Sequence, residues 1–172
     1  MRKVISYLSG IVFSSFVFLF VLFGCKSNVL RSGQKIVFPD VPPIYQGDTI
    51  QINLKEIKLI AFINGECWTC LNDFSLWESF TKEMNGLEEQ ISFMFYVKAL
   101  DYEAVKGSLK LFGFSHPVYI DRYNSFIRIN NFKANDTKWF LINENNEILL
   151  AGNSINDKSS KRKIRQIIKR YK

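Results

Sequence analysis

The stretch IKLIAFINGECWTC, residues 57–70, decides how the rest of the chain is interpreted. It begins with an almost continuous apolar run from Ile57 to Ile63, which is typical of a strand buried on both faces of a sheet. A short polar break follows, and apolar residues then recur at helical spacing from Cys70 to Met84. Two cysteines, Cys67 and Cys70, therefore stand between a buried strand and an amphipathic helix.

Outward from this stretch, the chain alternates strand and helix patterns. We expect strands at 35–38, 49–54, 91–97 and 117–120, a helix at 101–112, a hairpin at 139–143 and 147–151, and a C-terminal helix. Prolines and a glycine between the first two strands indicate a loop at 39–47, and 124–135 is either a short helix or an extended loop. This order predicts an α/β fold with a central mixed sheet flanked by helices.

The first residues have the features of a secretion signal. Arg2 and Lys3 precede an apolar segment, and the small residue Gly24 stands directly before Cys25. This end resembles a bacterial lipobox, in which the cysteine is lipidated and becomes the mature N-terminus. We therefore expect a lipoprotein signal peptide at 1–24, a lipidated tether and N-terminal extension at 25–48, and one domain at 49–172.

An uncleaved membrane anchor is the alternative for the same segment, because about 20 apolar residues can span a bilayer. Either anchor delivers the rest of the chain to an oxidising space outside the cytoplasm. We expect a bacterial envelope protein that is held at the membrane through Cys25 and faces the periplasm or the cell surface.

Composition narrows the kinds of function that the chain can have. Its 172 residues are 47% hydrophobic, which indicates a globular domain, and three cysteines are too few for a disulfide-stapled scaffold. A single histidine excludes a zinc site that needs two or more histidines. The net charge of +7 gathers at the end, where eight Lys or Arg residues and no acid lie between Lys158 and Lys172.

Isoleucines at helical spacing run through this basic end. We expect a terminal helix that docks its isoleucines on the domain and leaves a solvated basic face. The alternative is a basic helix lying near anionic lipid or nucleic acid. A lipid anchor argues against nucleic acid as a partner.

The sequence Cys67-Trp68-Thr69-Cys70 carries the chemistry that we expect. A cysteine at a helix N-terminus is favoured as the reactive thiolate, because free N–H groups and the helix dipole stabilise the anion. Cys67 would therefore attack a disulfide, and Cys70, one turn into the helix, would resolve the mixed disulfide. Half of a zinc site, an inert disulfide, and a relic pair on a fold kept for binding remain alternatives; we expect no metal and no cofactor.

Three segments resemble the thioredoxin-like superfamily, most closely the membrane-anchored, TlpA-like or redoxin-type thiol-disulfide oxidoreductases of bacterial envelopes. They are Leu59–Phe62, Cys67–Cys70, and Trp139–Asn143 followed by Asn146-Glu147-Ile148. The resemblance implies a thioredoxin-like fold and an enzyme that exchanges disulfides with the dithiols or disulfides of other envelope proteins. Reduction is the more typical direction, and a reductant would need a membrane electron donor.

Three residues depart from the pattern of that superfamily, and Ala61, in place of a buried acid, is the weakest objection. Thr137 stands where the family has a cis-proline facing the cysteines, and Glu66 stands where a Trp usually precedes the first cysteine. A negative charge at Glu66 would oppose a thiolate at Cys67. The departures at Thr137 and Glu66 favour the alternative function, a non-catalytic thioredoxin-fold lipoprotein that acts as a binding module. In either case Trp68, Thr69, Thr137 and Trp139 are the candidates for lining a groove for a partner protein.

Overall fold

The computed structural model describes residues 33–84, 86, 87, 89–132 and 138–171. Residues 31–172 form one compact unit, which is described here by itself. The predicted signal segment, Cys25 and Thr137 lie outside the described residues, so the predictions made for them stay predictions. None of the helices within the described ranges combines the length and the apolar character needed to cross a membrane.

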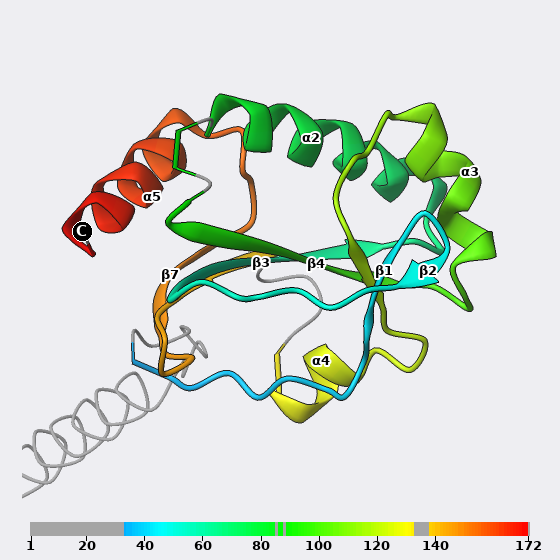
Figure 1. Cartoon of the computed structure of the whole chain (residues 1–172), viewed down its shortest axis with the longest axis horizontal. Coiled ribbons are helices and arrows are strands. Elements are labelled where there is room, and N and C mark those ends of the chain that lie inside the picture. The colour runs from blue at the N-terminus through cyan, green and yellow to red at the C-terminus, as the bar shows by residue number, and fades with distance from the viewer. Residues whose placement is uncertain (1–32, 85, 88, 133–137, 172) are drawn as a thin grey trace, which may run out of the picture. The chain divides into compact units, whose positions relative to one another are not determined.

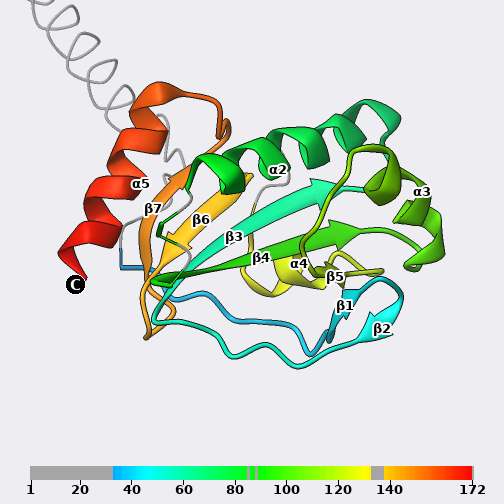
Figure 2. The ribbon, with the colours of Figure 1, turned by 45° about the horizontal axis from the view of Figure 1, so that its top comes forward.

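The described residues build one mixed sheet, as predicted (Figure 2). Its strands are β1 (Pro43–Tyr45), β2 (Asp48–Thr49), β3 (Ile57–Asn64), β4 (Ile91–Lys98), β5 (Val118–Ile120), β6 (Trp139–Ile142) and β7 (Ile148–Gly152). They lie in the order β2-β1-β5-β4-β3-β6-β7. β3, β4 and β5 are parallel, whereas β6 and β1 run antiparallel to their neighbours β3 and β5. The carboxyl ends of the three central strands therefore share one edge of the sheet.

Helices cover both faces of this sheet (Figure 1). They are the 3₁₀ helix η1 (Trp68–Asn72) and the α-helices α2 (Asp73–Glu83), α3 (Glu103–Leu111), α4 (Ser125–Ile129) and α5 (Lys158–Arg170). α2, α3 and α5 lie on one face and α4 lies on the other. An α/β architecture with a flanked mixed sheet is thus confirmed.

β3 is buried on both faces, as its apolar run predicts. Leu59, Ala61 and Ile63 belong to the core beneath α2, α3 and α5, where they meet Phe74 and Trp77 of α2. The opposite face is aromatic: the ring of Phe126 from α4 stacks on Tyr96 of β4 at a centroid distance of 4.7 Å. Each fully buried Leu, Ile or Phe side chain among these contributes about 1.5–3 kcal/mol to folding, so the strand before the cysteines is firmly held.

The expected strand at 35–38 is wrong. Lys35 makes one isolated bridge to Glu147. After this bridge, the side-chain amide of Asn130 takes the place of a neighbouring strand as hydrogen-bond partner of the backbone. Its Oδ1 accepts from the N–H of Val37 at 2.7 Å, and its Nδ2 donates to the carbonyl of Val37 at 2.8 Å. The backbone polar groups of Val37 are thus satisfied without a ladder.

The predicted loop at 39–47 contains strand β1. Pro43 opens this strand, a place where the missing N–H of proline is tolerated. Ile44 pairs with Val118 of β5, and a turn at Gln46 and Gly47, both with positive φ, leads into β2. The expected strand at 49–54 shortens to Asp48–Thr49, so the sheet begins before residue 49.

The expected helices are confirmed with small shifts. The first begins as η1 and continues as α2, and the second is α3. The Oδ1 of Asp101 accepts from the N–H of Ala104 at 2.9 Å, which caps the start of α3. The ambiguous segment after 124 forms the short helix α4, and α5 buries Ile164 and Ile168 as predicted.

Candidate redox site

The cysteine pair lies at the carboxyl edge of the central strands. Two residues, Gly65 and Glu66, separate the end of β3 from Cys67, which is the N-cap residue of η1. The carbonyl of Cys67 accepts from the N–H of Cys70 at 2.9 Å and from that of Leu71 at 3.2 Å. η1 runs on directly into α2, so Cys67 stands at the start of the helical segment that follows β3.

Cys67 and Cys70 form a disulfide, with their Cα atoms 5.1 Å apart. Both residues are half-buried, so neither cysteine is sealed inside the core. The Oγ1 of Thr69 lies 3.3 Å from the Sγ of Cys67, within hydrogen-bonding reach of sulfur. Trp68 is 78% exposed, so a large apolar surface stands beside the disulfide.

Gly65 sets the geometry of the turn into the site. Its N–H donates to the carbonyl of Lys98 at 2.9 Å. A Cβ at this position would lie 2.9 Å from that carbonyl oxygen and 2.9 Å from Cγ1 of Val105. Only glycine allows this close approach, which draws the cysteine loop against the end of β4.

Lys98, the last residue of β4, pairs with Glu66. Its Nζ lies 2.6 Å from Oε2 of Glu66, so the negative charge that the sequence places beside Cys67 has a positive partner. Sequence reasoning missed this pairing. The one signal for it was a lysine at the end of an otherwise apolar strand that is parallel to β3.

A second ion pair lies near the start of α2. Nζ of Lys138 is 3.1 Å from Oδ2 of Asp73, and the carbonyl of Lys138 accepts from the N–H of Phe62 at 2.8 Å. These contacts hold the chain that enters β6 beside the end of β3. Thr137 directly precedes Lys138 but lies outside the described residues.

Trp139, expected as a groove residue, is buried in the core with 1% of its surface exposed. Its ring packs over Gly152 of β7, where a Cβ would come within 2.7 Å of Cε2. The side chain is therefore directed into the core and is not presented to solvent beside Cys67. The other two described groove candidates, Trp68 and Thr69, are exposed.

The one histidine belongs to a different cluster, away from the cysteines in the sequence. Nε2 of His116 lies 2.8 Å from Oγ1 of Thr81 and 3.8 Å from the buried carboxylate of Glu78. Glu78 accepts from the N–H of Ser115 at 3.0 Å and pairs with Lys82 at 3.1 Å. Burial alone would raise the pKa of Glu78, but these hydrogen bonds and the nearby charge of His116 together lower it.

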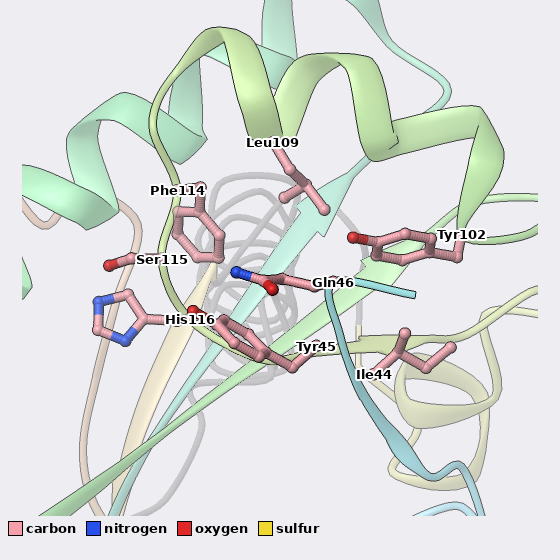
Figure 3. A pocket seen from close by; sticks show the side chains of 8 residues that line it. All are labelled: Ile44, Tyr45, Gln46, Tyr102, Leu109, Phe114, Ser115 and His116. Carbon is pink, nitrogen blue, oxygen red and sulfur yellow. The ribbon is translucent and has the colours of Figure 1, made fainter. Parts of the chain in front are cut away.

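A small pocket of about 170 Å³ lies beside this cluster (Figure 3). The side chain of Gln46 extends into its middle, between Tyr102, Leu109 and Phe114, whereas His116 and Ser115 lie at one side. Neither Cys67 nor Cys70 lines it. Within the described ranges, no group of three or more His, Cys, Asp or Glu side chains could hold a metal ion.

A parallel β-α-β core, an antiparallel hairpin at β6–β7 and a Cys-x-x-Cys disulfide at the start of the first helix together define a thioredoxin-like fold. Among solved structures, a proposed protein disulfide isomerase from Bacteroides thetaiotaomicron aligns with a TM-score of 0.63 and 14% identity. The alignment covers 82% of this chain and 92% of that one.

Two further structures have the same fold. The thioredoxin domain of a thiol-disulfide oxidoreductase from Bacteroides vulgatus gives a TM-score of 0.62 at 9% identity, covering 81% of this chain and 99% of that one. A proposed thiol:disulfide interchange protein DsbE from Chlorobium tepidum gives 0.60 at 17% identity, covering 82% and 97%. No family model matches the chain, and no curated protein matches it significantly.

Proposed function

We propose that the protein is a thiol-disulfide oxidoreductase that exchanges disulfides with other proteins outside the cytoplasm. The observation that carries the proposal is the half-buried Cys67–Cys70 disulfide at the start of the helix after β3. The names of the similar structures, which include a thiol-disulfide oxidoreductase and a thiol:disulfide interchange protein, agree with it.

Cys67 is the attacking residue in this proposal. In the reduced protein, the free N–H groups at the start of the helix stabilise its thiolate. The hydroxyl of Thr69, 3.3 Å from the Sγ of Cys67, can donate a hydrogen bond to the same sulfur. The pairing of Glu66 with Lys98 reduces the repulsion that the carboxylate would otherwise exert on the thiolate.

The exchange proceeds in two displacements. The Cys67 thiolate attacks one sulfur of a partner disulfide, a new S–S bond forms, and the second partner sulfur leaves as a thiolate with the electron pair. The Cys70 thiolate then attacks the Sγ of Cys67, which forms the Cys67–Cys70 disulfide and releases the first partner sulfur as a thiolate. The partner gains two electrons, the protein loses two, and solvent protonates the released thiolates.

The exposed Trp68 is the proposed contact for the partner protein. It is adjacent to Cys67 and 78% exposed, and aromatic side chains with large apolar surfaces are enriched in protein interfaces. The same exposure favours the second candidate, a lipoprotein that binds partners without catalysis. The outcome of a redox assay separates the two candidates.

We also propose that Cys25 is lipidated and holds the domain at the bacterial envelope. The support is the sequence alone: a positive start, an apolar segment, and Gly24 before Cys25. Partner dithiols or disulfides would then be those of envelope proteins. In the reducing direction, a membrane electron donor would return the Cys67–Cys70 pair to the dithiol form.

Reduction of insulin by dithiothreitol tests the function, with turbidity as the readout. The wild-type chain should accelerate the reaction, whereas Cys67→Ser should lose the acceleration. Cys25→Ser is the matched control, because it removes a cysteine outside the site and should remain active. Equal rates for wild type and Cys67→Ser would reject the enzyme and leave the binding module.

A further inference from the structure

The C-terminal helix carries a basic hollow that the redox proposal does not use. We propose that this hollow docks the domain onto the surface of a bilayer containing anionic phospholipid. Its volume is about 540 Å³, and five of the eight described residues that line it are cations. The cations are Lys158, Lys161, Arg162, Arg165 and Lys169, and the carboxylate of Glu83 lies among them.

The cations of the hollow lie on one stripe of α5. Lys158, Arg162, Arg165 and Lys169 follow one another at intervals of four, three and four residues, which places them on one side of a helix. Ile164 and Ile168, on another side, are buried against the domain. Packing of the isoleucines therefore fixes the direction in which the basic stripe faces, and Figure 1 shows α5 lying at one end of the domain.

Glu83 at the end of α2 holds part of this stripe in place. Its carboxylate pairs with Nζ of Lys161 at 2.8 Å, and its carbonyl accepts from Nη2 of Arg165 at 3.0 Å. Lys158, Arg162 and Lys169 are exposed, and α5 itself contains no acidic residue. Because the hollow contains one carboxylate and five cations, its net charge is strongly positive. This charge is complementary to phosphate-bearing headgroups.

Two observations favour a lipid surface over nucleic acid as the occupant. Tyr171, just after α5, is 42% exposed beside Lys169 and Arg170, and tyrosines with neighbouring cations are typical of membrane interfaces. Either predicted anchor also keeps a bilayer close: only seven residues separate Cys25 from Gly33, and the eight steps along the chain between them span at most roughly 28 Å. A surface held within that reach is present at high effective concentration.

Lysine footprinting on the full chain tests the proposal. The chain is inserted through its N-terminal apolar segment into vesicles of phosphatidylcholine alone, or of phosphatidylcholine with phosphatidylglycerol. Acylation of each lysine is then followed by mass spectrometry. Lys158 and Lys169 should be protected several-fold in the anionic vesicles only, and high salt should remove the protection because exposed charges are screened. Lys163, on the same helix but outside the hollow, is the internal control.

A matched pair of double variants separates the hollow from the charge of the helix. Arg162→Gln with Lys169→Gln should abolish the protection of Lys158, whereas Lys163→Gln with Arg170→Gln should keep it. Both pairs remove one Arg and one Lys from α5, so their net charges are equal. The proposal would be overturned if the lysines were protected equally in both kinds of vesicle, or if both double variants lost the protection equally. It would also be overturned if a DNA oligonucleotide protected the lysines more strongly than anionic vesicles do.

Discussion

Nζ of Lys98 lies 2.6 Å from Oε2 of Glu66, and this pair joins the end of β4 to the residue directly before Cys67. The backbone reinforces the same connection, because the N–H of Gly65 donates to the carbonyl of Lys98. The cysteine loop is thus tied to the neighbouring parallel strand by a charge pair and a hydrogen bond.

The Lys98–Glu66 pair is expected to tune the reactivity of Cys67. In the reduced protein, Lys98→Gln leaves the Glu66 carboxylate unpaired and should slow alkylation of Cys67 by iodoacetamide at pH 7, whereas Glu66→Gln should accelerate it. Because the pair is partly exposed, each change should be about two- to threefold. The double variant should react at nearly the wild-type rate. Changes in the same direction for both single variants would contradict this electrostatic role.

Gly65→Ala should destabilise the domain by about 1–3 kcal/mol, because its Cβ meets the Lys98 carbonyl and Val105. Gly107→Ala is the matched control, since an added Cβ there meets nothing within 4 Å. In the exposed interior of α3 it should stabilise by about 0.5–1 kcal/mol. Urea unfolding measures both. A Gly65→Ala variant as stable as wild type would show that the loop moves freely away from β4.

Glu78 should contribute a pH-dependent part of the stability. Its pKa is lowered below the ordinary 4.5: burial opposes the charged form, but hydrogen bonds from Ser115 and Lys82 and the charge of His116 outweigh it. A lowered pKa means that the stabilisation is present above the ordinary pKa and is lost as the pH falls through the folded-state value.

Glu78→Gln should therefore cost about 1–3 kcal/mol at neutral pH, and its unfolding free energy should converge on that of wild type in acid. Lys82→Gln, which removes an exposed partner, should cost less than about 1 kcal/mol. A Glu78→Gln deficit that stays constant from neutral to acid pH would contradict the assignment of a charged, hydrogen-bonded carboxylate.

Cys25→Ala should abolish incorporation of radiolabelled fatty acid and release the domain from the membrane fraction, because an acyl chain supplies the membrane affinity. Cys67→Ser serves as the control and should retain the label. Labelling of the Cys25→Ala variant at the wild-type level would rule out lipidation at this residue.

The buried centre of the fold could be predicted from the sequence. The apolar run at 57–63 and the helical spacing after Cys70 each depend on residues close together in the chain, and both elements are confirmed as β3 and α2. β1 could not be predicted, because Pro43–Tyr45 acquires strand geometry only by pairing with Val118 and Tyr119, more than seventy residues later. The same holds for residues 35–38, which form no strand because the backbone of Val37 is hydrogen-bonded by the side chain of the distant Asn130.

In the candidate site, too, the features that depend on nearby residues could be predicted, and those that depend on tertiary contacts could not. The positions of Cys67 and Cys70 at a strand-to-helix junction follow from local pattern, and their disulfide is present in the structure. The partner of Glu66 and the burial of Trp139 depend on which strands lie side by side, and pattern alone does not reveal this. An aromatic residue at the start of β6 could line a groove or belong to the core. Trp139 belongs to the core, because its ring packs over Gly152.

Trapping of a mixed disulfide tests the central claim most directly. The reduced Cys70→Ser and Cys67→Ser variants are each mixed with a disulfide-bonded peptide, and the covalent adducts are located by mass spectrometry. Without a resolving thiol, Cys70→Ser should accumulate a stable adduct at Cys67, whereas Cys67→Ser should form little adduct at Cys70. An adduct that forms equally on both variants, or mainly at Cys70, would contradict the assignment of Cys67 as the attacking residue.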